Sequence, residues 1–247
     1  MKRRYIVGGI AIVFAILLSA IFLPRLGMIQ AAQTEKAVRA SVAKAGIPMQ
    51  TFGEGYVSPV DFEALRAGNK DIYAWLYIPG VGISEPLLQR DGDTQYYAEH
   101  NSIGGADNVG TLFTDSEYSN RDFSDLATVI YGKNTWKGRL FSELQAAYSS
   151  ASGLRENSEI IVYLPDEEIH YTAFAAAPFR NYNIPYYFKF SVPARYQTFL
   201  DLVRSVRTVD AHWNDEEEVT TADQLLILST IRSGSSSTCY LVLAKRS

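Results

Sequence analysis

The clearest strand in this sequence is Ile72-Tyr73-Ala74-Trp75-Leu76-Tyr77-Ile78, which stops at Pro79-Gly80. Its residues are mostly β-branched or aromatic, the types that fit a pleated and packed surface, and a Pro-Gly pair is typical of a turn. The same alternation of apolar runs and turn residues recurs along the chain. Further strands are predicted at residues 83–89, 110–114, 127–131, 159–164, 169–177, 224–230 and 238–245. The sequence therefore predicts one mainly β domain.

Helices are expected to take a smaller share of the chain. Ser58-Pro59 has the form of an N-cap with proline at the first helical position, and it predicts a short helix through about Ala67. Two more short helices are predicted at residues 94–99 and 138–148. A longer helix follows Ser191-Val192-Pro193, because apolar residues recur there at three- and four-residue steps and form one face. Those residues are Tyr196, Phe199, Leu200, Val203 and Val206.

The composition excludes several classes of protein. With 47% hydrophobic and 20% charged residues, the chain is too apolar to be disordered. Its 23 Lys and Arg are outnumbered by 27 Asp and Glu, which argues against a nucleic-acid partner. Cys239 is the single cysteine, so no disulfide can form within the chain. Three scattered histidines and one cysteine give no metal-ligand spacing, and we predict no metal and no cofactor.

The first residues have the pattern of a membrane anchor. Met1-Lys2-Arg3-Arg4 is basic, and the next 19 residues, 5–23, carry no charge. At about 1.5 Å per residue this run spans the roughly 30 Å of a bilayer core. The basic end is expected in the cytoplasm, which puts the rest outside the cell. We therefore predict a tail at 1–4, a transmembrane anchor at 5–24, a stalk at 25–57 and a domain at 58–247. A signal peptide cleaved near Ala31-Ala32 is the alternative.

Three segments together resemble class B sortases. Residues 60–80, from Val-Asp-Phe-Glu-Ala-Leu to Trp-Leu-Tyr-Ile-Pro-Gly, are similar to the short helix and first barrel strand of that family. Residues 122–132, which end in Thr128-Val129-Ile130-Tyr131-Gly132, resemble the segment that ends in Tyr-Gly-His-Asn and carries the catalytic histidine. Leu226-Ile227-Leu228-Ser229-Thr230 resembles the strand that ends in Leu-Ser-Thr-Cys, whose cysteine is the nucleophile.

The resemblance implies a fold and an activity. The fold is an eight-stranded β-barrel with a short N-terminal helical segment and a longer helix before the last two strands. Sortases are membrane-anchored extracellular cysteine transpeptidases of Gram-positive bacteria, which join sorting-signal proteins to the cell wall or to a pilin. Their chemistry uses a thiolate, a histidine that moves the proton, and an arginine that stabilises substrate and charge. The implied partners are a sorting-signal peptide, a pilin or a partner sortase.

At the three matching positions, this sequence has none of the family's catalytic residues. Lys133 stands at the histidine position, Ile231 at the cysteine position and Cys239 at the arginine position on the last strand. The isoleucine cannot form an acyl intermediate. The resemblance marks Ser229 and Thr230 as substrate-binding residues. It therefore implies a catalytically degenerate sortase that acts as a binding or accessory protein.

Two alternatives to this interpretation stay open. Cys239 could act as a displaced nucleophile with Lys133 as its base, which would make the chain an active transpeptidase. A plain structural adaptor without peptide binding is the other alternative. Arg232 follows Ile231 directly, and a one-residue step along a strand turns its side chain to the opposite face.

Overall fold

The computed structural model describes residues 33, 36, 56–135, 139–235 and 237–247. The predicted anchor at 5–24 and nearly all of the predicted stalk lie outside these residues. Within the described part of the chain, no helix has both the length and the apolar character needed to cross a bilayer.

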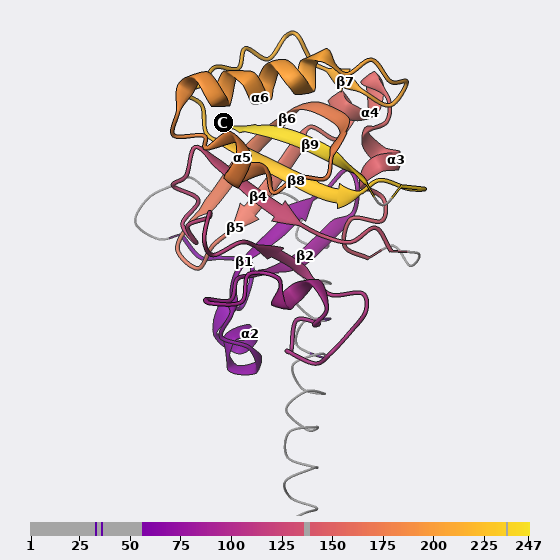
Figure 1. The fold of residues 1–247 in the computed structure, drawn as a ribbon. Coiled ribbons are helices and arrows are strands. Elements are labelled where there is room, and N and C mark those ends of the chain that lie inside the picture. Colours follow the sequence, from indigo (N-terminus) through magenta and orange to yellow (C-terminus); the bar gives the residue numbers. More distant parts are fainter. Residues whose placement is uncertain (1–32, 34–35, 37–55, 136–138, 236) are drawn as a thin grey trace, which may run out of the picture.

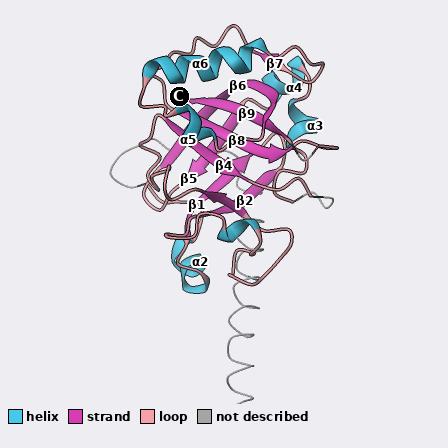
Figure 2. Cartoon of the chain, in the orientation of Figure 1, coloured by secondary structure: helices cyan, strands magenta, loops and turns pink. Residues whose placement is uncertain are grey.

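Eight strands close into a barrel (Figures 1 and 2). Their order around the barrel is β5-β1-β2-β3-β4-β8-β9-β6, and pairing of β5 with β6 closes the ring. A ninth, two-residue strand, β7, is added at the outer side of β6. The strands are β1 (Ile72–Ile78), β2 (Ile83–Leu88), β3 (Leu112–Thr114), β4 (Ala127–Tyr131), β5 (Glu159–Tyr163), β6 (Glu168–Arg180), β7 (His212–Trp213), β8 (Leu225–Ile231) and β9 (Thr238–Arg246).

Short helices cover the barrel on several sides. In Figure 1 the longest one, α6, lies across the top of the view above β9 and β6, and α2 lies at the bottom near β1. The described helices are α2 (Phe62–Gly68), the 3₁₀ turn η1 (Tyr96–Ala98), α3 (Leu144–Tyr148), α4 (Ala151–Glu156), α5 (Ile184–Phe188) and α6 (Pro193–Ser205). Proline stands in the first turn of both α5 and α6, where its missing N–H costs no hydrogen bond.

Alternate residues of the strands bury two different cores. In β8, Leu226 and Leu228 belong to the core inside the barrel, together with residues from every other strand of the ring. Leu225 and Ile227 point the other way and pack in a second core, which α6 covers with one apolar face. That face carries Tyr196, Phe199, Leu200 and Val203, as the helical spacing predicts. Both faces of β8 and β9 are therefore buried over most of their length.

The predicted mainly β domain with eight barrel strands is confirmed, and several element bounds differ. Helix α2 begins three residues later than predicted: Asp61, not Ser58, is its N-cap, and its carboxylate accepts a hydrogen bond from the Ala64 N–H at 2.9 Å. The predicted helix at 94–99 is only the three-residue turn η1. Of the predicted helix at 138–148, only Leu144–Tyr148 is α-helical among its described residues. The sequence reasoning missed α4, α5 and β7.

Candidate functional site

The candidate site is a cavity of about 380 Å³ at one end of β4 and β8. Its walls come from five separate parts of the chain: the turn around η1, the start of β3, the end of β4, the loop after β6 and the end of β8. The lining residues are Gln95, Ala98, Thr111, Phe113, Tyr131, Gly132, Lys133, Asn181, Tyr182, Asn183, Ser229, Thr230 and Ile231. Four of the five residues that the sequence predicted for the site, Lys133, Ser229, Thr230 and Ile231, therefore share this cavity.

Parallel pairing of β4 with β8 brings the two predicted catalytic segments together. Tyr131 is the register partner of Ser229, and the Gly132 N–H donates to the Ser229 carbonyl at 3.1 Å. Gly132 is required here because a Cβ at this position would lie 2.3 Å from Leu112 Cδ2 and 2.6 Å from Phe141 Cδ2. Only glycine lets the chain pass this close to the core and then turn outward at Lys133.

Lys133 is the one residue with a formal charge in the cavity lining. Its Nζ donates a hydrogen bond to the Asn108 backbone carbonyl at 2.8 Å. No carboxylate of the described residues forms an ion pair with it. The ammonium group has three N–H donors, so this one contact leaves two of them for a ligand.

Thr230 and Ser229, at the end of β8, both line the cavity. Thr230 is 2% exposed, and its Oγ1 has no hydrogen-bond partner in the described structure. A buried hydroxyl without a partner costs free energy, on the order of 1–3 kcal/mol. Ser229 is buried as well, on the opposite face of β8. The Thr230 hydroxyl is closed to solvent, on the face of β8 that carries Leu226 and Leu228 in the barrel interior.

Cys239 lies directly opposite Ile231 in the β8–β9 ladder but does not line the cavity. Ile231 is 39% exposed, whereas Cys239 is 1% exposed and packs in the core under α6. The Cys239 Sγ donates to the carbonyls of Phe179 and Arg180 at 3.5 and 3.7 Å. Burial raises the pKa of the thiol to about 11, although hydrogen bonds from Ser229 and from its own backbone act in the opposite direction. Such a thiol is neutral at pH 7 and closed to solvent.

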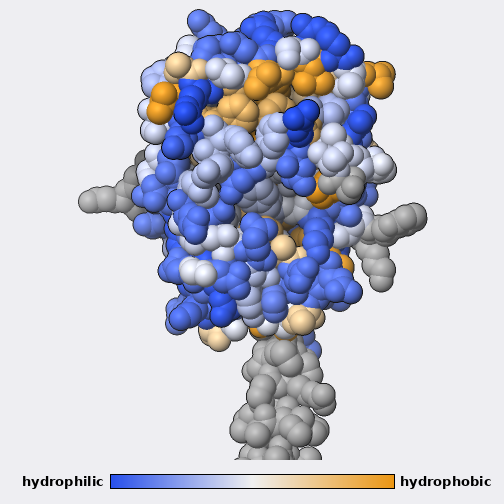
Figure 3. Space-filling view, in the orientation of Figure 1, coloured by the Kyte–Doolittle hydropathy of each residue, from blue (hydrophilic) through white to orange (hydrophobic). Residues whose placement is uncertain are grey.

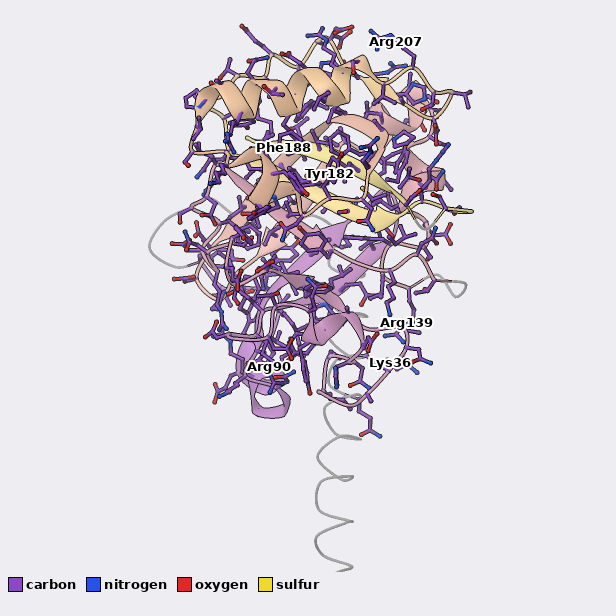
Figure 4. All side chains as sticks on the ribbon, viewed as in Figure 1. Lys36, Arg90, Arg139, Tyr182, Phe188 and Arg207 are labelled. Atoms are coloured by element: carbon purple, nitrogen blue, oxygen red, sulfur yellow. The ribbon has the colours of Figure 1, made fainter. Side chains whose placement is uncertain are left out.

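The loop after β6 forms a wall that the sequence reasoning did not anticipate. Tyr182 lies on this wall, and its hydroxyl accepts a hydrogen bond from Arg180 at 2.7 Å. Asn183 caps α5, since its side chain accepts from the Tyr186 N–H at 3.3 Å. Figure 4 shows Tyr182 and Phe188 below α6 on the viewer's side of the barrel. The Asn-Tyr-Asn sequence before Ile184-Pro185 was the available signal for a capped short helix.

The β8–β9 loop is fixed to the body of the barrel by a buried carboxylate. Asp210 accepts hydrogen bonds from Arg232 at 3.0 Å and from Gln145 at 3.3 Å, and Gln145 accepts in turn from the Ser233 N–H. Burial alone raises the pKa of Asp210, but hydrogen bonds from Thr208 and Arg232 outweigh it and hold the pKa below its usual value. Arg232 therefore points away from the cavity, toward Asp210.

The surface around the site is mostly polar, and no metal centre is present in the described part of the chain. In Figure 3 hydrophobic residues show mainly in the layer just below α6, and most of the remaining face is hydrophilic. Among the described residues, no three His, Cys, Asp or Glu side chains lie close enough to hold a metal ion.

Comparison with known proteins gives one sequence relative and many structural neighbours. The chain is 38% identical over 81 residues to sortase B of Listeria monocytogenes, a match that covers 33% of this chain and about a third (32%) of that protein. No family model matches the sequence.

The structural neighbours are class B sortases. Sortase B of Clostridium perfringens superposes with a TM-score of 0.65 at 22% identity, covering 75% of this chain and 98% of that one. Staphylococcus aureus sortase B has a TM-score of 0.68 at 22% identity and 88% and 98% coverage. A substrate complex of the same enzyme has a TM-score of 0.64 at 23% identity and 78% and 86% coverage. Together with the closed eight-stranded barrel, these likenesses show that the chain has the fold of the class B sortases.

Proposed function

We propose that this protein is a catalytically degenerate sortase that binds peptides in cell-wall or pilus protein anchoring. The observation that carries the proposal is the separation of cavity and thiol. The cavity between β4, β8 and the loop after β6 is open to a ligand, while the single cysteine of the chain is buried beside it. Ile231, where the nucleophile would stand, offers only an apolar contact.

The ligand class follows from the relatives and from the cavity. Staphylococcus aureus sortase B has been solved with a substrate bound, and this chain has the same fold. The cavity has the size of a small-ligand site and combines aromatic walls at Phe113, Tyr131 and Tyr182 with hydroxyl and amide groups. Such a lining suits a short stretch of extended peptide, and a sorting signal is the peptide that we propose.

The proposed location is the cell membrane, with the barrel outside. The support for it is the basic cluster 1–4 followed by the uncharged run 5–23. A cysteine-free reporter fused at either end, probed with protease on intact cells, tests this orientation. Protection of a C-terminal reporter would contradict it.

The test of peptide binding uses the full chain in detergent micelles and a panel of fluorescent sorting-signal peptides. We expect saturable binding by fluorescence anisotropy, with no cleavage and no added mass on Cys239. An acyl adduct on Cys239 that disappears in Cys239→Ala would instead establish the displaced-nucleophile enzyme. No saturable binding of any peptide would favour the structural adaptor.

Two matched variants locate the binding site. Ile231→Trp places a large ring in the cavity mouth and is expected to weaken binding at least about tenfold. Val209→Trp makes a comparable change at a position that is 91% exposed and does not line the cavity. Equal binding by both variants would show that the peptide binds elsewhere.

A further inference from the structure

Four tyrosine rings, here called the tyrosine row, continue outward from the cavity over and beside α5. Tyr182 lines the cavity, and the centroid of its ring lies 4.8 Å from that of Tyr187. The centroids of Tyr187 and Tyr186 are 5.4 Å apart, and those of Tyr186 and Tyr118 are 6.5 Å apart. Tyr186 and Tyr187 are 56% and 54% exposed, and adjoining rings left in water mark an interaction site more often than single exposed residues do.

The rings of the tyrosine row form notches and not a flat platform. Tyr186 and Tyr187 meet at 86°, and Tyr118 and Tyr186 meet at 78°. Beside them lies a hollow of about 290 Å³, with Pro185 and Phe190 among its walls. A sugar ring stacks best on a flat aromatic face, whereas angled rings beside an apolar hollow hold side chains such as proline or leucine. The geometry therefore favours an extended peptide over a polysaccharide.

The charges beside the tyrosine row are positive at the end nearest the cavity. Residues 169–200 contain no aspartate or glutamate, and their Lys and Arg residues are Arg180, Lys189 and Arg195. Arg180 donates a hydrogen bond to the Tyr182 hydroxyl at 2.7 Å, and Arg195 donates to the Tyr187 carbonyl at 3.4 Å. In the described part of the chain, no carboxylate forms an ion pair with any of these three cations.

The two arginines retain donors for the acidic side chains of a ligand. Each guanidinium group has five N–H donors in a planar fork, and the contacts just described use one donor of each. At the far end of the row the charge changes sign, because Asp125 lines the hollow together with Tyr118. Acidic residues of a bound peptide are therefore expected next to the cavity, and apolar residues are expected farther along the row.

We propose that the tyrosine row binds an acidic peptide segment that flanks the part held in the cavity. The carboxylates of this segment lie at Arg180 and Arg195, and its apolar side chains pack against Tyr186 and the hollow beside it. This inference rests on the proposed peptide binding and makes it more specific. Because Tyr182 belongs to both the cavity and the row, the two form one continuous surface for a single extended chain.

The experiment compares matched peptides on the full chain in detergent micelles. Each sorting-signal peptide is extended at its N-terminal or its C-terminal end by a short segment that carries Glu or Gln at the same positions, beside the same Pro and Leu. At about 20 mM salt we expect the Glu form at one end to bind about fivefold or more tightly than its Gln form. At about 500 mM salt the difference should fall to about twofold or less, because salt screens exposed charges. The net charge of the chain is −4, so overall attraction cannot produce a preference for Glu.

The outcomes separate this inference from the proposed function. Equal dissociation constants for the Glu and Gln forms at both ends would overturn the inference while leaving the proposed function intact. No binding of any peptide, extended or not, would overturn both. Polygalacturonate is the probe for an acidic polysaccharide. Its binding, together with equal binding of the Glu and Gln peptides, would overturn the assignment of the row to a peptide.

Two double variants assign the Glu preference to the arginines of the row. Arg180→Gln combined with Arg195→Gln is expected to reduce the preference to about twofold or less. Arg207→Gln combined with Lys70→Gln removes the same number of charges at exposed positions that line neither the cavity nor the hollow, and it is expected to keep the preference. A preference that survives the loss of Arg180 and Arg195 contradicts the inference.

A last pair of variants tests the rings. Tyr186→Ala is expected to weaken binding of the extended Glu peptide about fivefold and to leave binding of the unextended peptide unchanged, because Tyr186 does not line the cavity. Leu202→Ala removes a comparable exposed side chain on α6 and is expected to change neither. The same loss for extended and unextended peptides, or no loss for either, would show that the tyrosine row does not hold the flanking segment.

Discussion

Ile231 and Cys239 are register partners in adjacent strands, yet their surroundings differ completely. Ile231 is 39% exposed at the mouth of the cavity, whereas Cys239 is 1% exposed under α6. The residue that could be a nucleophile lies in the core, and the residue that ligand can reach has no reactive group. Two residues that pair across β8 and β9 therefore need not share a function. Whether a thiol can react depends on its access to solvent and on its pKa.

The largest expected difference in stability comes from placing a carboxylate at Cys239 and, for comparison, at Ile231. Cys239→Asp is expected to lower the free energy of unfolding by about 3–5 kcal/mol, because no described cation is placed to pair with a carboxylate there. Ile231→Asp should cost less than about 1 kcal/mol, since its carboxylate reaches water. Urea unfolding followed by tryptophan fluorescence measures both. Equal losses would mean that the two positions are buried alike.

The raised pKa of Cys239 gives the second prediction. In the folded chain the thiol keeps its proton up to about pH 11. In the unfolded chain the thiol has its usual pKa of 9.0 and loses the proton about two pH units lower. Between these values the folded state binds more protons, so its stability falls as the pH rises, by up to about 3 kcal/mol.

The buried tyrosines also destabilise the fold at high pH, so a matched variant is needed. Cys239→Ala keeps the tyrosines and lacks the thiol, and its unfolding free energy should fall less between pH 9 and 11. Parallel pH curves for the two proteins would be the contrary result.

The third prediction compares the rate at which a thiol is labelled at position 239 with the rate at position 231. At pH 8 the native chain should react with iodoacetamide at least about a hundredfold more slowly than an Ile231→Cys variant made in a Cys239→Ala background. The reason is that two units of pKa reduce the thiolate fraction about a hundredfold, and burial slows the reaction further. Similar rates, measured by mass spectrometry, would show that the core at Cys239 opens readily.

The smallest expected effect concerns Asp210, whose hydrogen bonds hold the β8–β9 loop to the body of the barrel. Asp210→Ala removes the acceptor of Arg232 and Gln145 and is expected to cost about 1–2 kcal/mol. Asp215→Ala removes the exposed pair with Arg204 and should cost less than about 0.5 kcal/mol. Thermal unfolding compares the two. Equal costs would mean that the Asp210 contacts contribute no more than a surface pair.

The strands were the most predictable part of the molecule. Strands β1 and β4 begin and end at the predicted residues, because their apolar runs are bounded by turn residues. Helix α6 follows from its apolar spacing. Helices α4 and α5 and strand β7 have two to six residues, too few to form by local propensity, and packing on the barrel stabilises them. Pattern analysis along the sequence does not detect elements of this kind.

The cavity was predictable only in part. Lys133 and Ile231 follow segments with a recognisable pattern, and the parallel β4–β8 pairing brings those segments together. Tyr182 and Gln95 come from loops about 50 and 40 residues away from Lys133, and no local signal joins them to it. The burial of Cys239 depends on α5 and α6, whose packing across β9 no strand pattern reveals.

The place of β9 in the barrel also has a consequence for folding. This strand lies between β6 and β8, with nine and seven register pairs to them, although it follows both in the chain. Until β9 is available, β6 and β8 each present an open edge, and open edges favour aggregation. The last closing contacts join residues far apart in sequence, which makes folding slow. A chain of this topology has its greatest need of chaperone protection after most of the barrel has been made and before β9 has inserted.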